Sequence, residues 1–239
     1  MKGIFITGTD TGVGKTIVSS VMARILHERG VNVGVMKPVT SGCLVENGRP
    51  KSEDAELLAW SAGIAEVSPD MAPYILKLPM APAEAATRDG VKIDFRLVAS
   101  SFYRLADSHD FMIVEGAGGL MVPIAEGQLI ADLIKFVSLP VVVVARPGLG
   151  TVNHTLLTCF AARQLGIDVR GVVVNDYPES PGPAEESAPR LIASLAGTLL
   201  LGLFPHQQGD TLREVVAKLA DLLADQPATE ILLRKIGAA

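Results

Sequence analysis

A short apolar run near the start of the chain leads directly into a glycine-rich loop and then into a helical pattern. The run Ile4–Ile6 is followed by "TGTDTGVGKT", which ends at Thr16. A loop between a strand and a helix can wrap its backbone N–H groups around phosphate oxygens, and the helix N-terminus adds partial positive charge. Five residues separate Gly8 from Gly14, one more than in the usual G-x-x-x-x-G-K-[ST] motif. The sequence therefore predicts a phosphate-binding loop (P-loop) with a lengthened leading edge.

Lys15 and Thr16 are the residues of this loop with the clearest expected chemistry. The Lys15 ammonium is expected to reach the β- and γ-phosphates of a nucleotide, and the Thr16 hydroxyl is expected to hold Mg²⁺. The extra residue reshapes the leading edge, where Thr9, Asp10 and Thr11 could face a second substrate. We predict that the loop and the first helical turn bind the nucleotide through Gly12, Val13, Gly14, Lys15, Thr16 and Ile17.

Short runs of branched apolar residues recur along the chain, and helical patterns separate them. Most of these runs are apolar throughout, which is typical of strands buried on both faces of a parallel sheet. The predicted strands are Gly3–Thr7, Val31–Met36, Phe111–Val114, Val141–Ala145, Gly171–Val174 and Leu199–Phe204. The predicted helices are Lys15–Arg29, Asp54–Ala62, Phe95–Ala106, Ile130–Val137, Asn153–Leu165, Pro189–Leu195, Thr211–Leu223 and Ala228–Ile236.

This alternation of strands and helices indicates an α/β protein. We predict a single domain over residues 1–239, built as a doubly wound parallel sheet with helices on both faces, as in P-loop NTPases. A chain of 239 residues is long enough to bury the core of one such domain. The segment Asn175–Pro189 is rich in proline, glycine, serine and glutamate, so we predict a surface loop there.

Polar and glycine-rich segments follow the predicted strands. In an open α/β sheet, ligands bind at the carboxyl ends of the strands, so these segments are expected to converge on one site. Beyond the P-loop, they contribute Lys37, Ser41, Glu115, Gly116–Gly119, Gly150, Asn175, Asp176 and Pro205. The convergence of several such segments is stronger evidence for a site than any single motif.

Each candidate side chain also has an ordinary structural explanation. Lys37 ends a buried strand, where its ammonium either meets an anion or extends to solvent. Glu115 lies where P-loop enzymes hold Mg²⁺, although a solvated carboxylate at the sheet edge is the alternative. Asp54 opens a helix, so it is either a metal partner or a carboxylate that suits the helix dipole. Ser41 and Asn175 are either ligand contacts or turn residues.

The composition excludes some partners. The chain has 26 acidic and 21 basic residues, with a net charge of −5, which argues against nonspecific nucleic-acid binding. No apolar run reaches the about 20 residues needed to cross a bilayer, and the N-terminus leads into a strand without a signal-peptide pattern. We therefore expect a cytoplasmic protein with neither nucleic acid nor membrane as a partner.

Five motifs together resemble those of one enzyme family. "TGTDTGVGKT", "KPVTSG", "VEGAGGLMVP", "GLGTVNHTLLT" and "VVVND" resemble, in their order and at their intervals, motifs of the dethiobiotin synthetases of biotin synthesis. "LLGLFP" is similar to the last strand of that family. The resemblance implies that 7,8-diaminononanoate, CO₂ and ATP are joined into dethiobiotin, ADP and phosphate. One amine takes up CO₂ as a carbamate, ATP phosphorylates it, and the second amine closes a cyclic urea.

The resemblance implies a role for each matching position. The residues implied in catalysis are Lys37, Lys15 and Thr11. The residues implied around Mg²⁺ are Thr16, Asp54 and Glu115. The residues implied at the diamine or its carbamate are Thr11, Lys37, Ser41, Gly150 and Asn153. Besides the P-loop, the residues implied at the nucleotide are Asp54, Glu115, Gly116, Ala117, Gly118, Asn175, Asp176 and Pro205.

The resemblance also implies a homodimer. The helix start at Gly150–Asn153 resembles the part of the family that meets the carboxylate of the substrate across the dimer interface. A helix N-terminus is a natural anion site, so physical chemistry supports that role. The chain departs from some relatives at Gly12, where they carry glutamate, and any contact made by that side chain is absent here.

Two other classes share a P-loop domain of this kind. Deviant P-loop ATPases with regulatory or partitioning roles use an additional lysine near the start of the loop, but residues 9–13 contain none. The last predicted helix carries only Arg234 and Lys235 as cations, which is not a basic membrane-targeting helix. The amidotransferases of cobalamin synthesis need a glutamine-hydrolysing domain, for which 239 residues leave no room. A non-catalytic nucleotide sensor would not need Lys37 and Ser41 together.

Overall fold

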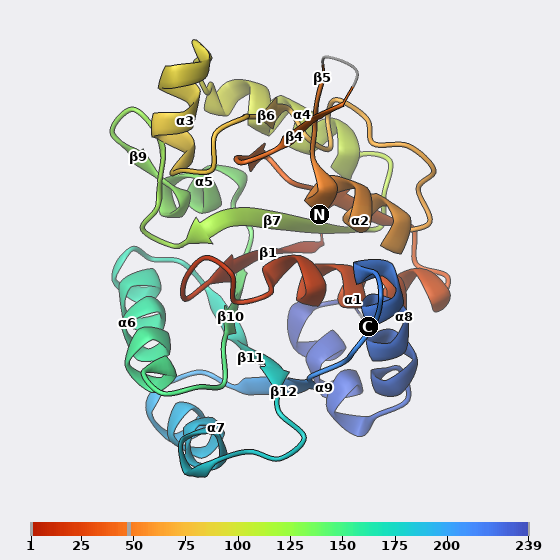
Figure 1. Cartoon of the computed structure of the whole chain (residues 1–239), viewed down its shortest axis with the longest axis vertical. Coiled ribbons are helices and arrows are strands. Elements are labelled where there is room, and N and C mark those ends of the chain that lie inside the picture. The colour runs from red at the N-terminus through yellow and green to blue at the C-terminus, as the bar shows by residue number, and fades with distance from the viewer. Residues whose placement is uncertain (1, 47–48, 239) are drawn as a thin grey trace.

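The computed structural model describes residues 2–46 and 49–238, which are built around a twisted parallel sheet (Figure 1). Its six strands lie in the order β12–β11–β10–β1–β7–β2, and every neighbouring pair is parallel. Their bounds are β1 Gly3–Gly8, β2 Val33–Met36, β7 Phe111–Gly119, β10 Val141–Ala145, β11 Val169–Tyr177 and β12 Leu200–Pro205. All six predicted strands are thus present, most of them with different ends. Strand β7 continues five residues beyond its predicted end at Val114, so Gly116–Gly119 belong to the strand and not to a segment that follows it.

Strand β1 lies in the middle of the sheet, with β10 on one side and β7 on the other. Its residues Ile4, Phe5 and Ile6 are fully buried, as expected for a strand covered on both faces. The chain order reverses on the two sides of β1, and ligands bind where such a reversal opens a crevice at the carboxyl ends of the strands. The P-loop leaves β1 at this point.

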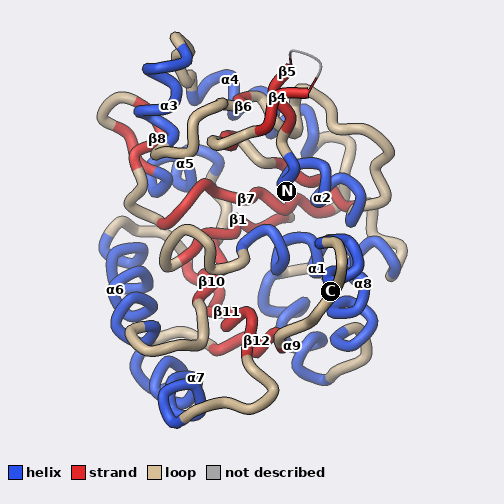
Figure 2. Tube along the Cα trace, viewed as in Figure 1, coloured by secondary structure: helices blue, strands red, loops and turns tan. Residues whose placement is uncertain are grey.

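Helices cover both faces of the sheet, which confirms the predicted doubly wound α/β fold. Helix α1 packs against α2 and α8, α4 packs against α5, and α6 packs against α7. In Figure 1, α6 lies to the left of the sheet and α1 and α8 lie to the right, and Figure 2 shows the strands between them. Their bounds are α1 Lys15–Glu28, α2 Glu53–Ser61, α3 Pro82–Asp89, α4 Phe95–Ala106, α5 Ile130–Val137, α6 Thr151–Gln164, α7 Pro183–Leu195, α8 Leu212–Leu223 and α9 Pro227–Ile236.

Three small two-stranded sheets lie outside the main sheet. The pairs are β3 Val39–Thr40 with β6 Tyr74–Ile75, β4 Leu44–Glu46 with β5 Arg49–Lys51, and β8 Pro123–Ala125 with β9 Gln128–Leu129. None of these short strands, nor helix α3, was predicted from the sequence. Each strand of the three small sheets has only two or three residues, which is too short for a periodic pattern to appear.

The predicted surface loop at Asn175–Pro189 is wrong in part. Strand β11 continues to Tyr177, and helix α7 begins at Pro183 instead of Pro189. A proline is tolerated in the first helical turn, but Pro189 in the helix interior has no N–H to offer the carbonyl of Glu185. The Tyr177 hydroxyl donates a hydrogen bond of 3.1 Å to that carbonyl. A side chain from β11 therefore supplies the donor that Pro189 lacks.

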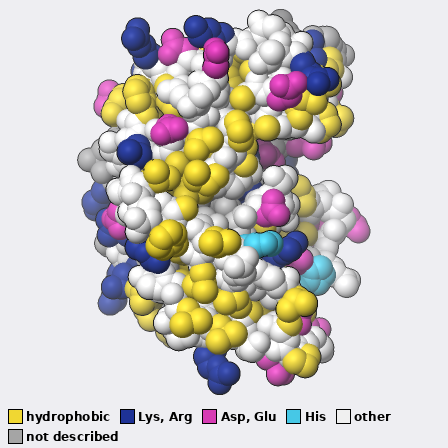
Figure 3. Space-filling model, turned by 90° about the vertical axis from the view of Figure 1, so that its left-hand side faces the viewer, with side chains coloured by type: hydrophobic (Ala, Val, Ile, Leu, Met, Phe, Trp, Pro, Cys, Tyr) yellow, Lys and Arg dark blue, Asp and Glu magenta, His cyan; other side chains and the backbone are white. Residues whose placement is uncertain are grey.

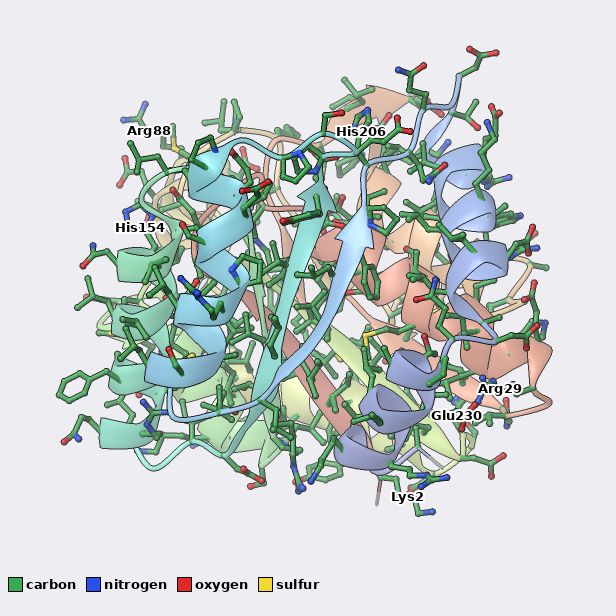
Figure 4. The ribbon with its side chains drawn as sticks, turned by 90° about the horizontal axis from the view of Figure 1, so that it is seen from below. Lys2, Arg29, Arg88, His154, His206 and Glu230 are labelled. Carbon is green, nitrogen blue, oxygen red and sulfur yellow. The ribbon has the colours of Figure 1, made fainter. Side chains whose placement is uncertain are left out.

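The C-terminal helix α9 is joined to the end of α1 by a short ion pair. Arg29 Nη1 lies 2.6 Å from Glu230 Oε1, and both residues are labelled in Figure 4. Arg29 Nη2 also donates to the carbonyl of Ala224, at the end of α8.

Among the described residues, no helix has the length and apolar character needed to cross a membrane.

Candidate active site

A cavity of about 330 Å³ lies at the carboxyl ends of β1, β2 and β7. Its lining residues are Thr11, Gly12, Gly14, Lys15, Thr16, Lys37, Thr40, Ser41, Asp54, Glu115, Ala117 and Gly118. Apart from Thr40, every one of these was expected from the sequence to belong to the site. Thr40 was overlooked, and the only signal for it was its place between Lys37 and Ser41 in one loop.

Gly14 allows the P-loop to close tightly against the end of β11. Its φ of 87° is in the left-handed region, where glycine is favoured, and it forms the N-cap of α1. A Cβ at this position would lie 2.0 Å from Asn175 Nδ2, so a larger residue would clash. Asn175 Nδ2 donates a hydrogen bond of 3.3 Å to the carbonyl of Val13. The amide of Asn175 therefore braces the loop, whereas the sequence suggested only a base contact or a turn residue.

Lys15 is buried inside its own loop. Its Nζ donates a hydrogen bond of 3.1 Å to the carbonyl of Asp10, which curls the leading edge of the loop around the ammonium. Burial, followed by the charge of Lys37, lowers the pKa of Lys15 to about 8. A phosphate group would supply the negative charge that this buried cation lacks.

Four side chains form one polar cluster, which we name the acidic cluster: Thr16 of α1, Lys37 just beyond β2, Asp54 of α2 and Glu115 of β7. The Thr16 hydroxyl lies 2.8 Å from Glu115 Oε1 and 3.2 Å from Asp54 Oδ1. Lys37 Nζ lies 2.5 Å from Glu115 Oε1 and 2.8 Å from Asp54 Oδ2, and it also donates to the carbonyl of Gly116. The solvent-exposed alternatives for Lys37 and Glu115 are wrong, because these residues are 4% and 0% exposed.

The charges of the acidic cluster stabilise one another. Burial lowers the pKa of Lys37, but the carboxylates of Glu115 and Asp54 outweigh burial and raise it above the ordinary value for lysine. Burial also raises the pKa of Asp54, and the charge and hydrogen bond of Lys37 outweigh that effect and lower it. Lys37 and Asp54 are therefore both charged at neutral pH.

Local structure holds the acidic cluster in place. Ser52 caps helix α2 by accepting a hydrogen bond of 3.2 Å from the N–H of Ala55, and the Thr40 hydroxyl lies 2.9 Å from the Ser52 hydroxyl. The cap places Asp54 in the first turn of α2, where the helix dipole favours a carboxylate. The N–H of Lys37 donates to the carbonyl of Met71, which fixes the backbone just beyond β2.

The oxygen atoms of the acidic cluster suit a Mg²⁺ ion. Thr16, Asp54 and Glu115 offer a hydroxyl and two carboxylates, the hard ligands that this ion takes. Glu115 Oε2 is buried and has no hydrogen-bond partner, so it can accept a further cation. In residues 2–46 and 49–238, no group of three or more His, Cys, Asp or Glu side chains could hold a metal. The residues therefore fit an ion that phosphate oxygens of a nucleotide help to hold.

The remaining predicted site residues are not among those that line the cavity. Val13 and Ile17 turn their side chains to the core, so they can offer only backbone to a ligand. Gly116 meets the acidic cluster through its carbonyl. Gly150 and Asn153 lie at the N-terminus of α6.

Asp176 is the next-to-last residue of β11, and Pro205 is the last residue of the neighbouring strand β12. Asp176 has a φ of 61°, in the left-handed region, and its Oδ1 lies 2.6 Å from His206 Nδ1. Figure 4 shows His206 beside the ends of β11 and β12. Nothing in the local sequence pattern of His206 points to a partner 30 residues away.

Comparisons with known proteins identify the family. Residues 2–211 match a family described as an AAA domain, to which the chain belongs. The chain is 43% identical over 205 residues to the ATP-dependent dethiobiotin synthetase BioD of Bacillus licheniformis, covering 86% of each protein. It is 41% identical over 201 residues to the BioD protein of Methanococcus vannielii, covering 84% of this chain and 92% of that protein.

A solved structure shows the fold in a more distant protein. The cell division ATPase MinD of Pyrococcus furiosus superimposes with a TM-score of 0.52 at 19% identity, covering 100% of this chain and 98% of that one. At this identity the likeness concerns the fold alone. The sequence relatives are much more similar, and their names agree with the motifs that line the cavity. The chain belongs to the family of the ATP-dependent dethiobiotin synthetases.

Proposed function

We propose that this protein joins 7,8-diaminononanoate and CO₂ at the expense of ATP, and releases dethiobiotin, ADP and phosphate. The observation that carries the proposal is the cavity lined by two buried lysines, Lys15 and Lys37, and by the carboxylates of Asp54 and Glu115. Such a site can hold a phosphorylated substrate and stabilise charge that develops during phosphoryl transfer. Membership of the synthetase family supports the choice of substrates.

The P-loop and the acidic cluster have different proposed roles in binding the nucleotide. In our proposal, the backbone N–H groups of Gly12–Thr16 bind the phosphates, and Lys15 neutralises their charge. Thr16, Asp54 and Glu115 would hold Mg²⁺, which would offset the charge of the phosphates when bound. Asn175, Asp176 and Pro205 would border the adenine, since Asn175 contacts the P-loop and the other two lie at the adjoining ends of β11 and β12.

Thr11 and Ser41 are the proposed contacts of the diamine and its carbamate. Both line the cavity on segments that follow different strands. A Cβ built at Gly118 would lie 3.4 Å from Thr11 Oγ1, so the lengthened edge of the P-loop faces the glycine-rich end of β7. The second substrate would then enter between the P-loop and this strand end, and Lys37 would contact the carbamate and the phosphoryl group in transit.

An exposed apolar face on α6 supports the proposed homodimer. Asn153, Leu157 and Phe160 follow a helical spacing on one side of α6, and Leu157 and Phe160 are each 57% exposed. Leu149, just before the helix, is 88% exposed. Figure 3 shows apolar side chains gathered on this side of the molecule. Burying this face against a second copy would bring Gly150 and Asn153 into an interface, where the helix N-terminus could bind the substrate carboxylate.

One assay tests the proposed function. Phosphate release from ATP should require both 7,8-diaminononanoate and bicarbonate, and the product should be dethiobiotin by mass spectrometry. A regulatory or partitioning ATPase would hydrolyse ATP without the diamine, so equal rates with and without it would rule out the proposal. The family comparison already disfavours that alternative. The cytoplasmic location stays a prediction.

A further inference from the structure

The Lys37 ammonium is enclosed by the two carboxylates of the acidic cluster. It lies 2.8 Å from Asp54 Oδ2 and 2.5 Å from Glu115 Oε1, and Glu115 is fully buried. A buried carboxylate without a counter-ion is strongly disfavoured. The ammonium of Lys37 is therefore the positive group paired with both carboxylates before a ligand arrives.

The same carboxylates are the proposed ligands of Mg²⁺. Asp54 directs one oxygen to Lys37 and the other to Thr16, while Glu115 Oε1 serves both Lys37 and Thr16. Only Glu115 Oε2 has no partner. A divalent ion on these oxygens would lie beside a positive charge in a buried site, where repulsion is poorly screened. The ammonium and the metal ion therefore compete for one carboxylate pair.

We propose that Lys37 is the resting counter-ion of Asp54 and Glu115, and that Mg²⁺ arriving with the nucleotide displaces its ammonium into the cavity. Lys37 already lines this cavity, and a lysine side chain can turn about four single bonds to reach it. The exchange would release Lys37 for the carbamate and the phosphoryl group only after the metal is in place. This inference rests on the proposed function, because it takes Mg²⁺ and ATP as the ligands.

Manganese binding to the nucleotide-free protein tests the exchange directly. Mn²⁺ takes the same hard oxygen ligands as Mg²⁺, and its free fraction is measured by electron paramagnetic resonance. Lys37→Met removes the competing cation, so Mn²⁺ should bind at least about tenfold more tightly than to the wild type. Lys37→Arg retains a cation and should bind Mn²⁺ as weakly as the wild type. Lys51→Met is a matched control, because Lys51 pairs with Glu46 and Glu56 away from the acidic cluster.

The double variant Lys37→Met, Glu115→Gln shows where the ion binds. If the gain in Mn²⁺ affinity of Lys37→Met disappears in this double variant, the ion is bound by the carboxylate pair. Equal Mn²⁺ affinity of Lys37→Met and the wild type would overturn the proposal. Circular dichroism checks folding, and Lys37→Gln replaces the methionine variant in the same titration if that variant does not fold. The titration uses neither ATP nor diamine. It can therefore fail while diamine-dependent phosphate release succeeds, and the reverse also holds.

Discussion

The Thr16 hydroxyl lies 2.8 Å from Glu115 Oε1, although 99 positions separate the two residues in the chain. Thr16 belongs to the first turn of α1, just after the P-loop, and Glu115 belongs to β7. Strands β1 and β7 are neighbours in the sheet, so the P-loop and the acidic strand end open onto the same cavity. This contact places two of the proposed Mg²⁺ ligands side by side.

Glu115→Gln should retain the fold and lose most of the activity. A neutral amide holds Mg²⁺ more weakly than a carboxylate, so metal affinity should fall by at least about tenfold. The measurement is the Mg²⁺ dependence of kcat for the variant beside the exposed control Glu126→Gln. An unchanged kcat at limiting Mg²⁺ would show that Glu115 has only a structural role.

Lys15→Ala and Lys37→Ala should each reduce kcat/KM by about 10²- to 10³-fold, the range found when one preorganised donor to developing charge is removed. Both ammonium groups are buried at the cavity, where charge interactions are strong. ATP affinity is measured alongside kcat/KM for the diamine in each variant. A loss below tenfold in either variant would contradict the proposed role of that lysine.

Thr11→Val should weaken use of the diamine more than binding of ATP. The substitution keeps the size of the side chain and removes the hydroxyl that faces the glycine-rich end of β7. We expect a higher KM for the diamine and a nearly unchanged Kd for ATP, whereas Thr11→Ser retains the hydroxyl and should keep both values near those of the wild type. If only ATP binding suffers, the extra residue of the loop is simply a variation in the phosphate cradle.

The wild-type protein should be a dimer by light scattering at assay concentration. Leu157→Lys places a charge on the exposed face of α6, so it should favour the monomer and lower activity by removing Asn153 from the shared site. Leu222→Lys on α8 is the control, because Leu222 is similarly exposed on another helix. An active wild-type monomer would refute the dimer proposal.

Asp70 should stabilise the protein at neutral pH and lose this effect in acid. The hydrogen bonds of the Arg104 guanidinium hold the pKa of Asp70 below its usual value of about 3.9. Because the folded-state pKa is depressed, the stabilisation is present above the unfolded-state value and is lost as pH falls through the folded-state value. Asp70→Asn should lower Tm at pH 7, and the difference should vanish in strong acid. A difference independent of pH would exclude the ion pair as its cause.

The position of Asp70 links this ion pair to the active site. The next residue, Met71, accepts the hydrogen bond from the N–H of Lys37. Loosening the segment around Asp70 should therefore raise the mobility of Lys37 without removing it. Hydrogen exchange of the Lys37 amide measures this effect, and we expect faster exchange in Asp70→Asn than in the wild type.

Much of the fold follows from local patterns in the chain. Strand β10 and helices α4 and α5 have the bounds that the sequence predicts, because burial imposes a period or a continuous apolar run on neighbouring residues. Helix α3 was missed because only Pro82, Ala85 and Ala86 of its eight residues are buried, which leaves little apolar pattern. The start of α7 was missed because a proline inside a helix normally indicates a boundary. In α7, the Tyr177 hydroxyl donates a hydrogen bond to the carbonyl of Glu185, to which Pro189 has no N–H to donate.

Some features of the candidate site can be identified in the sequence, and others appear only in the structure. The phosphate loop, Lys37 and Glu115 could be identified in the sequence because strand, glycine and charge follow one another along the chain. The sequence could not show that Lys37 lies between Asp54 and Glu115. It also could not show that Asn175 braces the P-loop or that Asp176 contacts His206. These contacts join residues far apart in the sequence, and they depend on the order of the strands and on the packing of α2. Local propensity decides which segments become strands and helices, whereas only the assembled sheet brings their charged ends within a few ångströms of one another.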